Sequence, residues 1–145
     1  MTLWANDLEK RKLFSKVEAL TNVIGLDLYY RQFVKEFLGR SFYSKPRTSD
    51  QYLKQIISNS SKPVIITELQ AEPWEKDEKA YFSEETESMS PKILESNVKR
   101  AQKLGVKEIL LWGFEYWYWR RAKGDNSYFA TVKNYLNVVN RKYGN

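Results

Sequence analysis

Three short apolar runs alternate with longer segments of helical periodicity, and this alternation limits the possible fold more than any other feature of the chain. The runs cover residues 23–30, 64–69 and 108–113. Each run is mostly apolar and has the length of a strand, which is typical of strands buried on both faces of a parallel sheet. Strands that alternate with helices predict an α/β fold with a parallel sheet.

Four helices are expected around these strands, so that one helix precedes three strand–helix units. The first covers residues 3–20, in which apolar positions recur on one face. Capping side chains at residues 48–50 introduce the second helix. Ser90 followed by Pro91 introduces the third, which ends before a glycine. The last helix follows residues 124–126, which break the preceding pattern.

The connections between these elements are expected to be irregular. A loop is predicted over residues 31–46, and a longer acidic loop over residues 70–89. The third strand is expected to run on into the aromatic segment 114–119. No second unit is indicated, so residues 1–145 are interpreted as a single domain.

The chain contains no cysteine and no histidine, which excludes several classes of chemistry. Disulfides, thiol nucleophiles, Ser-His-Asp triads and most zinc sites all need one of these residues. We therefore expect no metal and no cofactor. Catalysis would have to depend on carboxylates, tyrosines or lysines, and paired carboxylates are the groups used in glycoside hydrolysis.

The net charge of +6 suggests an anionic partner such as nucleic acid, but the distribution of charge argues against one. Eight of the eighteen acids lie in residues 68–87, and the basic residues are scattered over the predicted helices. No apolar run approaches the roughly 18 residues of a membrane span. Residues 1–11 are polar and charged, unlike a signal peptide. We expect no nucleic-acid or membrane partner, and a cytoplasmic location unless the chain is a fragment, in which case an extracellular location is the alternative.

Acids, tyrosines and tryptophans follow each predicted strand. In parallel α/β sheets the functional residues gather at the C-terminal strand ends, so these side chains should share one rim. A sugar site needs this mixture of carboxylates, polar groups and flat aromatic rings. The candidates are Tyr29, Glu68, Glu72, Trp74, Trp112, Glu115 and Trp117. Glu68 stands out because it closes an apolar strand, although an acid that simply reaches solvent is an alternative.

Three segments resemble motifs of one enzyme family. The segment from Lys62 to Gln70 resembles the seventh-strand motif of clan A glycoside hydrolases, especially cellulases and mannanases, in which a Lys-Pro-aliphatic run leads to the nucleophilic Glu. Its extended form, residues 66–74, is similar to a cellulase-like subgroup. Residues 109–113 are similar to the clan's eighth strand, whose Trp forms the floor of the sugar subsite. Residues 23–29 are similar to its sixth strand, whose terminal Tyr hydrogen-bonds the nucleophile.

The resemblance implies the C-terminal half of a TIM (β/α)8 barrel, in which the fifth helix precedes strands six to eight. It implies that Glu68 is the nucleophile of a retaining hydrolysis of β-linked polysaccharide. Tyr29 would orient Glu68, unless the neighbouring Tyr30 is the residue that faces inward. The residues that would stack on sugar rings are Trp112, Trp117 and Trp74.

The family's acid/base is missing from the chain. That residue is a Glu after an Asn at the end of the fourth strand, and no Asn-Glu pair occurs here. Retaining hydrolysis needs both carboxylates, about 5–5.5 Å apart. Glu72 and Glu115 belong to segments that follow strands, so hydrogen bonds to sugar hydroxyls or anchoring of a loop are the roles that we favour for them.

Two hypotheses therefore remain open. In the first, the chain is one part of a glycoside hydrolase, completed by an N-terminal half-barrel chain or by a second copy in a homodimer. A half-barrel would leave strand edges unpaired and an apolar inner face uncovered, so it should need such a partner. In the second, the chain is a catalytically inactive carbohydrate-binding or scaffold protein.

Overall fold

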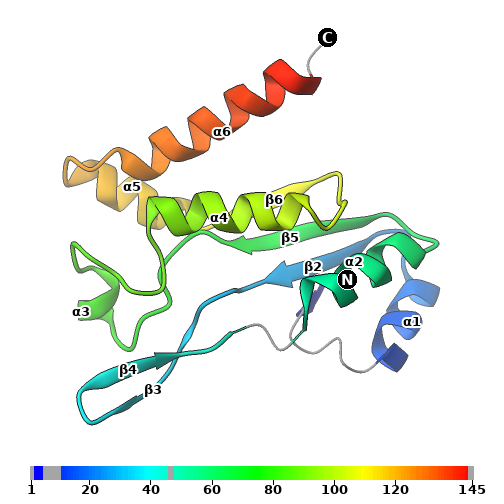
Figure 1. The fold of residues 1–145 in the computed structure, drawn as a ribbon, viewed down its shortest axis with the longest axis horizontal. Helices are drawn as coiled ribbons and strands as arrows, with labels where there is room; N and C mark the ends of the chain where they lie inside the picture. Colours follow the sequence, from blue (N-terminus) through cyan, green and yellow to red (C-terminus); the bar gives the residue numbers. More distant parts are fainter. Residues whose placement is uncertain (1, 5–10, 46–47, 144–145) are drawn as a thin grey trace.

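A parallel four-stranded sheet forms the centre of the fold. Its strands are β1 (Thr2–Trp4), β2 (Ile24–Leu28), β5 (Val64–Gln70) and β6 (Ile109–Trp112). The computed structural model describes residues 2–4, 11–45 and 48–143 (Figure 1). The strands lie in the order β1-β2-β5-β6, and each pairs in parallel with its neighbour. The three predicted strands, their parallel pairing and their sequential order are thereby confirmed.

Strand β1 was not predicted, because residues 3–20 were expected to form one helix. That expectation is wrong at its N-terminal end. Residues 2–4 pair with β2, and helix α1 (Arg11–Leu20) begins later. Leu3 lies opposite Leu26 and is buried, so pairing and burial override the local helical periodicity. The part of the expected helix between β1 and α1 lies outside the described residues.

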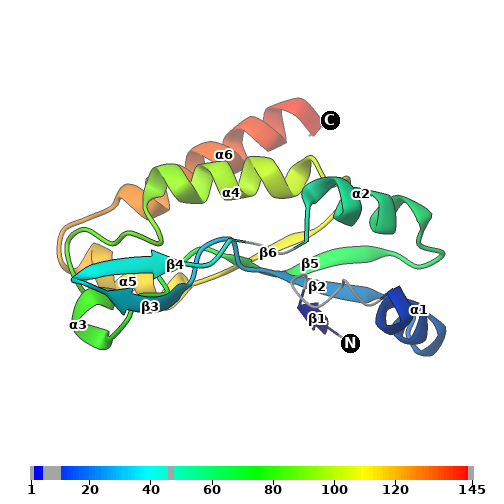
Figure 2. The same cartoon turned by 60° about the horizontal axis from the view of Figure 1, so that its bottom comes forward.

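Helices cover the sheet on the side that carries the core. Helix α2 (Asp50–Asn59) and helix α4 (Pro91–Gln102) lie along one face of the sheet, and α6 (Ser127–Tyr143) packs against α4 (Figures 1 and 2). The predicted caps are present. The Ser49 side chain accepts a hydrogen bond from the N–H of Tyr52, and the Ser90 side chain accepts one from the N–H of Ile93.

The core lies between this face and helices α2 and α4. The fully buried side chains that make it include Leu26, Ile66, Leu53 and Leu94. Each such residue stabilises the fold by about 1.5–3 kcal/mol through burial of apolar surface. The opposite face of β6 is uncovered. Because side chains alternate along a strand, Leu110 and Trp112 point away from the core, with 53% and 49% of their surface exposed.

A β-hairpin occupies the segment that was expected to be a loop over residues 31–46. Strands β3 (Phe33–Phe37) and β4 (Arg40–Tyr43) pair in antiparallel fashion. Leu38 and Gly39 form the turn with φ values of 51° and 71°. Two successive positive φ values are the geometry that best matches the twist of a two-residue hairpin. Leucine is an unusual residue at such a position, so the turn residues did not indicate a hairpin in the sequence.

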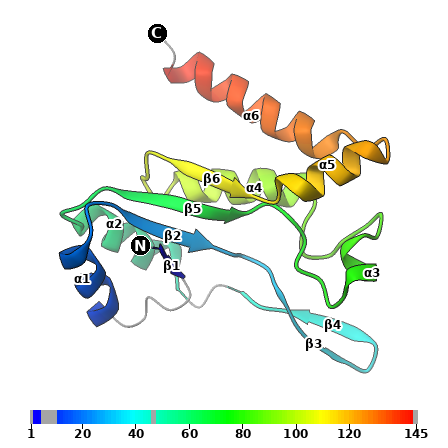
Figure 3. The same cartoon turned by 180° about the vertical axis from the view of Figure 1, so that it is seen from behind.

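Two further segments are helical where strand or loop was expected. Residues 114–119 do not continue the third strand, because Gly113 turns the chain with φ 129° and helix α5 (Phe114–Ala122) follows. The acidic segment 70–89 contains a single helical turn, α3 (Glu78–Tyr81). Helix α3 and the hairpin lie at the same end of the molecule, beyond the C-terminal ends of β2 and β5 (Figure 3).

Within the described part of the chain, no helix has both the length and the apolar character that crossing a lipid bilayer requires.

Candidate functional site

Tyr29 and Glu68 lie together at the C-terminal ends of neighbouring strands. The Tyr29 hydroxyl donates a hydrogen bond to Oε2 of Glu68 at 2.6 Å. The register places the two side chains within reach, since Asp27 of β2 lies opposite Glu68 of β5 after a local shift in pairing. The predicted contact is confirmed, and Tyr29 is the tyrosine that makes it.

Tyr30 points to the other side of the sheet. Its ring is buried, and the guanidinium of Arg100 from α4 lies 4.1 Å from its centroid. The alternation of side chains along an extended segment separates the two neighbouring tyrosines in this way. Tyr30 therefore does not contribute to the rim that carries Glu68.

The electrostatics of the pair keep the Tyr29 hydroxyl protonated. Burial, and then the hydrogen bond to the Glu68 carboxylate, raise the pKa of Tyr29 far above its ordinary value. The phenol therefore remains a donor and holds one carboxylate oxygen in place. The second oxygen, Oε1, makes no hydrogen bond to another residue that the structure describes.

Asp27 is a second carboxylate beside Glu68, and it was not chosen as a candidate from the sequence. Its side chain is 7% exposed and accepts a hydrogen bond from the Thr67 hydroxyl at 2.7 Å. Burial raises the pKa of Asp27, the Thr67 bond opposes this rise, and the charge of Glu68 adds to it. An acid inside an otherwise apolar strand was the signal that could have identified it.

Glu72 connects the end of β6 to the segment after β5. Its Oε1 accepts a hydrogen bond from Nε1 of Trp112 at 3.0 Å, and its Oε2 accepts one from the Tyr81 hydroxyl at 2.8 Å. Burial and this bond raise the pKa of Tyr81, so its hydroxyl also stays protonated. Half of the Trp112 surface remains exposed. Both carboxylate oxygens of Glu72 thus hold aromatic residues, as expected for a loop anchor.

Gly113 allows this close approach. A Cβ atom at residue 113 would lie 2.6 Å from the Cβ of Glu72 and 2.8 Å from its backbone nitrogen. Any side chain would therefore push apart the end of β6 and the segment after β5. The left-handed φ of Gly113 adds a second reason why only glycine fits.

Trp74 lies next to the Tyr29–Glu68 pair. Its ring centroid is 4.7 Å from that of Tyr29, with the planes tilted by 54°. Its backbone is held on both sides, because its N–H donates to the Ser88 hydroxyl at 2.7 Å and its carbonyl accepts from the N–H of Phe33 at 2.8 Å. The hairpin thus helps to fix the aromatic wall of the site.

A cavity of about 410 Å³ opens beside this wall, between the β3–β4 hairpin and α3. Its lining mixes aromatic rings with carboxylates, and it includes Phe33, Glu72, Trp74, Glu75, Tyr81 and Phe82. This volume falls in the range of ordinary small-molecule sites. Flat rings and hydrogen-bonding acids side by side suit a ligand with apolar faces and hydroxyl edges.

Of the seven sequence candidates, Glu72 and Trp74 line this cavity. Tyr29, Glu68 and Trp112 lie at the strand ends and are not among its lining residues, and neither are Trp117 and Glu115. Trp117 is only 5% exposed, and its Nε1 donates to the carbonyl of Ala71 at 2.6 Å, so it is a core residue that anchors α5. Glu115 is exposed in the first turn of α5 and makes no hydrogen bond to a described residue. The negative charge of Glu115 contributes to the raised pKa of Tyr81.

The described residues contain no group of three or more acidic side chains placed to hold a metal ion. The chain matches no protein-family model, and no curated protein and no solved structure is significantly similar to it.

Proposed function

We propose that this chain is the C-terminal half of a (β/α)8-barrel glycoside hydrolase that acts on β-linked polysaccharide by a retaining mechanism. The single observation that carries the proposal is the hydrogen bond from Tyr29 to Glu68 at the C-terminal strand ends. The contact was expected from the resemblance to the sixth and seventh strands of that family. It joins residues 39 positions apart in the chain.

In this proposal Glu68 is the nucleophile. Tyr29 holds Oε2, so that Oε1 attacks the anomeric carbon as the glycosidic C–O bond breaks and the leaving-group oxygen departs. Water then hydrolyses the resulting glycosyl-enzyme and restores the free Glu68 carboxylate. Trp112 and Trp74 provide the rings on which sugars stack, and Glu72 keeps the Trp112 indole in place. The cavity beside Trp74 accommodates the sugars that flank the cleaved bond.

The fold is compatible with strands five to eight of such a barrel. Four parallel strands in sequential order, with helices α2 and α4 along one face, repeat the unit from which an eight-stranded barrel is built. A complementary N-terminal half-barrel, or a second copy of this chain, supplies the remaining four strands. The acid that protonates the leaving oxygen comes from that partner, since Glu72 is engaged by Trp112 and Tyr81.

The test is to trap the glycosyl-enzyme. A 2-deoxy-2-fluoro glycoside with a good leaving group needs little protonation, so the chain should react without its partner acid. We expect a mass increase equal to one fluorosugar, carried by the peptide that contains Glu68. Glu68→Gln should abolish the increase, and Glu115→Gln, which changes an exposed acid on α5, should preserve it. Labelling that persists in Glu68→Gln would contradict the assignment of the nucleophile.

The second candidate function is binding of carbohydrate without hydrolysis. It is favoured by one observation, namely that both oxygens of Glu72, the rim acid nearest to Trp112, accept hydrogen bonds from aromatic residues. A chain of this kind would bind β-glucan oligosaccharides, measured by calorimetry, with an affinity that Trp74→Ala lowers and Glu68→Gln leaves unchanged. It would form no covalent adduct with the fluoroglycoside.

A further inference from the structure

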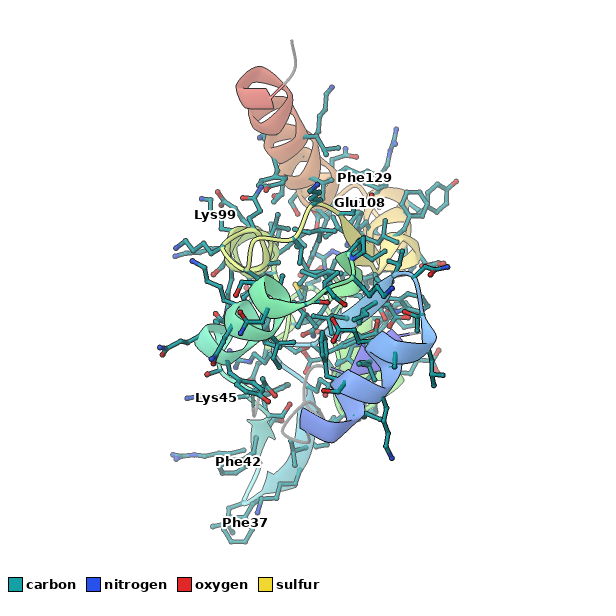
Figure 4. All side chains as sticks on the ribbon, turned by 90° about the vertical axis from the view of Figure 1, so that its right-hand side faces the viewer. Phe37, Phe42, Lys45, Lys99, Glu108 and Phe129 are labelled. Atoms are coloured by element: carbon teal, nitrogen blue, oxygen red, sulfur yellow. The ribbon has the colours of Figure 1, made fainter. Side chains whose placement is uncertain are left out.

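A second cavity lies outside the site described above. Its volume is about 630 Å³, and it lies between the base of the β3–β4 hairpin and the C-terminal part of α4. Tyr30, whose ring packs under Arg100, forms part of its wall. Figure 4 shows that Lys45, at the hairpin base, projects to the same side of the molecule as Lys99 of α4. The cavity thus belongs to the helix side of the sheet.

Among the residues that the structure describes, three cations line this cavity and no acid does. They are Arg31, Lys45 and Arg100. Two acids lie nearby. Asp50 accepts a hydrogen bond from Nε of Arg100, and Glu87 lies 3.8 Å from Arg31 in an exposed ion pair, which stabilises little. Lys45 makes no ion pair with a described residue. The cavity therefore has a positive wall that is only partly compensated.

Arg100 is prepared to bind an oxyanion. Its guanidinium is stacked on the Tyr30 ring and tied to Asp50 through Nε, while its terminal nitrogens donate to no residue that the structure describes. A planar guanidinium with a free edge binds phosphate-type oxygens through paired hydrogen bonds. Because the side chain is already held in place, little entropy is lost when it binds.

The neighbourhood of Arg100 also contains a buried donor and a buried acceptor without partners. The Tyr30 hydroxyl and Oδ1 of Asp50 have no hydrogen-bond partner among the described residues. Leaving such a group unsatisfied costs about 1–3 kcal/mol. A singly protonated phosphate both accepts and donates hydrogen bonds, and so can satisfy groups of both kinds, directly or through water.

We propose that this cavity binds a small phosphomonoester. The phosphate lies between Arg100 and Lys45, and the organic part lies against the rings of Phe42 and Tyr43, which also line the cavity. The volume is larger than a bare phosphate needs and is typical of small-molecule sites. The inference concerns a different side of the sheet from Glu68, so it does not depend on the proposed hydrolase function.

The experiment measures binding to the full chain by calorimetry, with inorganic phosphate, glucose 6-phosphate and glucose at matched ionic strength. We expect saturable binding of both phosphates and none of glucose. Lys45→Gln should weaken binding roughly tenfold, as expected for the loss of one charge-assisted hydrogen bond. Lys92→Gln, which changes an exposed lysine at the start of α4 outside the cavity, should have no effect.

A second variant separates binding from folding. Tyr30→Phe removes only the hydroxyl that has no partner, so the thermal midpoint of the free chain should not fall, while the affinity for glucose 6-phosphate should fall several-fold. The proposal is overturned if glucose binds as well as glucose 6-phosphate, or if neither phosphate saturates. It is also overturned if Lys92→Gln weakens binding as much as Lys45→Gln does, since that would indicate nonspecific attraction.

Discussion

The hydroxyl of Tyr29 is buried and donates to the Glu68 carboxylate. Because both features raise its pKa, they make the stability of the fold depend on pH in the alkaline range. Burial is the first cause of the raised pKa of Tyr29, and the same cause raises the pKa of Tyr81 and Tyr30. Above pH about 10 these phenols ionise in the unfolded chain but stay protonated in the folded one. The unfolded state then binds fewer protons, so the free energy of unfolding must fall as pH rises.

We predict that urea unfolding between pH 8 and pH 11 shows this loss of stability above pH about 10. Tyr29→Phe should reduce the slope of unfolding free energy against pH in that range, because one of the contributing phenols is gone. Tyr118→Phe, which changes an exposed tyrosine on α5, should leave the slope unchanged. A slope that is the same in all three proteins would contradict the raised pKa of Tyr29.

The Trp112 indole is exposed on one side, and its N–H is held by Glu72. We predict that Glu72→Ala increases quenching of Trp112 fluorescence by acrylamide and lowers stability by about 2 kcal/mol, since the hydrogen bonds from Trp112 and Tyr81 are both lost at about 1 kcal/mol each. Glu72→Gln keeps an oxygen that accepts from the indole, so it should resemble the unchanged chain. Trp112→Phe identifies the signal that belongs to this residue. Equal quenching in Glu72→Ala and Glu72→Gln would show that Glu72 does not position the ring.

Residue patterns predicted part of this site for an identifiable reason. Tyr29 and Glu68 each end an apolar strand, and parallel strands bring such ends to one edge. Asp27 was missed because strand pairing, which places it beside Glu68, includes a register shift that no local pattern indicates. Trp117 was expected at the rim because the turn at Gly113, which starts a helix, was not recognised.

At the scale of whole elements, the junction of β6 and α5 depends on one glycine. We predict that Gly113→Ala destabilises the chain by several kcal/mol in urea unfolding, because the new Cβ would overlap Glu72 and the backbone φ would be strained. Gly105→Ala is the matched control. It also changes a glycine with positive φ, but no atom lies within 4 Å of the new Cβ, so it should cost only about 1 kcal/mol. Equal losses would mean that close packing at Gly113 contributes nothing.

The hairpin turn leads to a prediction of opposite sign. Leu38 is held at φ 51°, which is costly for a branched side chain, and 86% of its surface is exposed. Leu38→Asn should stabilise the chain by about 0.5–1 kcal/mol, since Asn-Gly is the preferred pair for this turn. Lys35→Asn in β3 should bring no gain. A loss of stability in Leu38→Asn would show that the leucine makes a contact that compensates its strain.

Elements were predictable to different degrees. Long apolar runs and side-chain caps identified β2, β5, β6, α2 and α4, because each signal lies within its own segment. Strand β1 has three residues and is stabilised by β2, which its own sequence cannot indicate. The hairpin was missed because its turn is Leu-Gly and not one of the preferred pairs.

For the molecule as a whole, the uncovered face of the sheet is the feature with the widest effect. Leu110 and Trp112 point away from the core, and the outer edge of β6 pairs with no described strand. Unpaired edges and apolar faces favour association with another sheet. We predict that sedimentation of the purified chain shows dimers or larger assemblies, and that a complementary half-barrel chain, when added, forms a complex with it. Leu110→Lys should shift the population toward monomer, whereas Leu20→Lys on α1 should not. A cooperative monomer would contradict the half-barrel proposal.

The contact between Glu72 and the Trp112–Gly113 pair has a use in searching for distant relatives. The Trp112 indole donates to the Glu72 carboxylate, and the backbone at residue 113 leaves no room for a Cβ beside the backbone of Glu72, so two separate constraints tie the end of β6 to the segment after β5. A glutamate followed 40 residues later by Trp-Gly is therefore a joint signature of this architecture. Weighting these positions together would distinguish true relatives from chains that merely share an apolar strand before an acid.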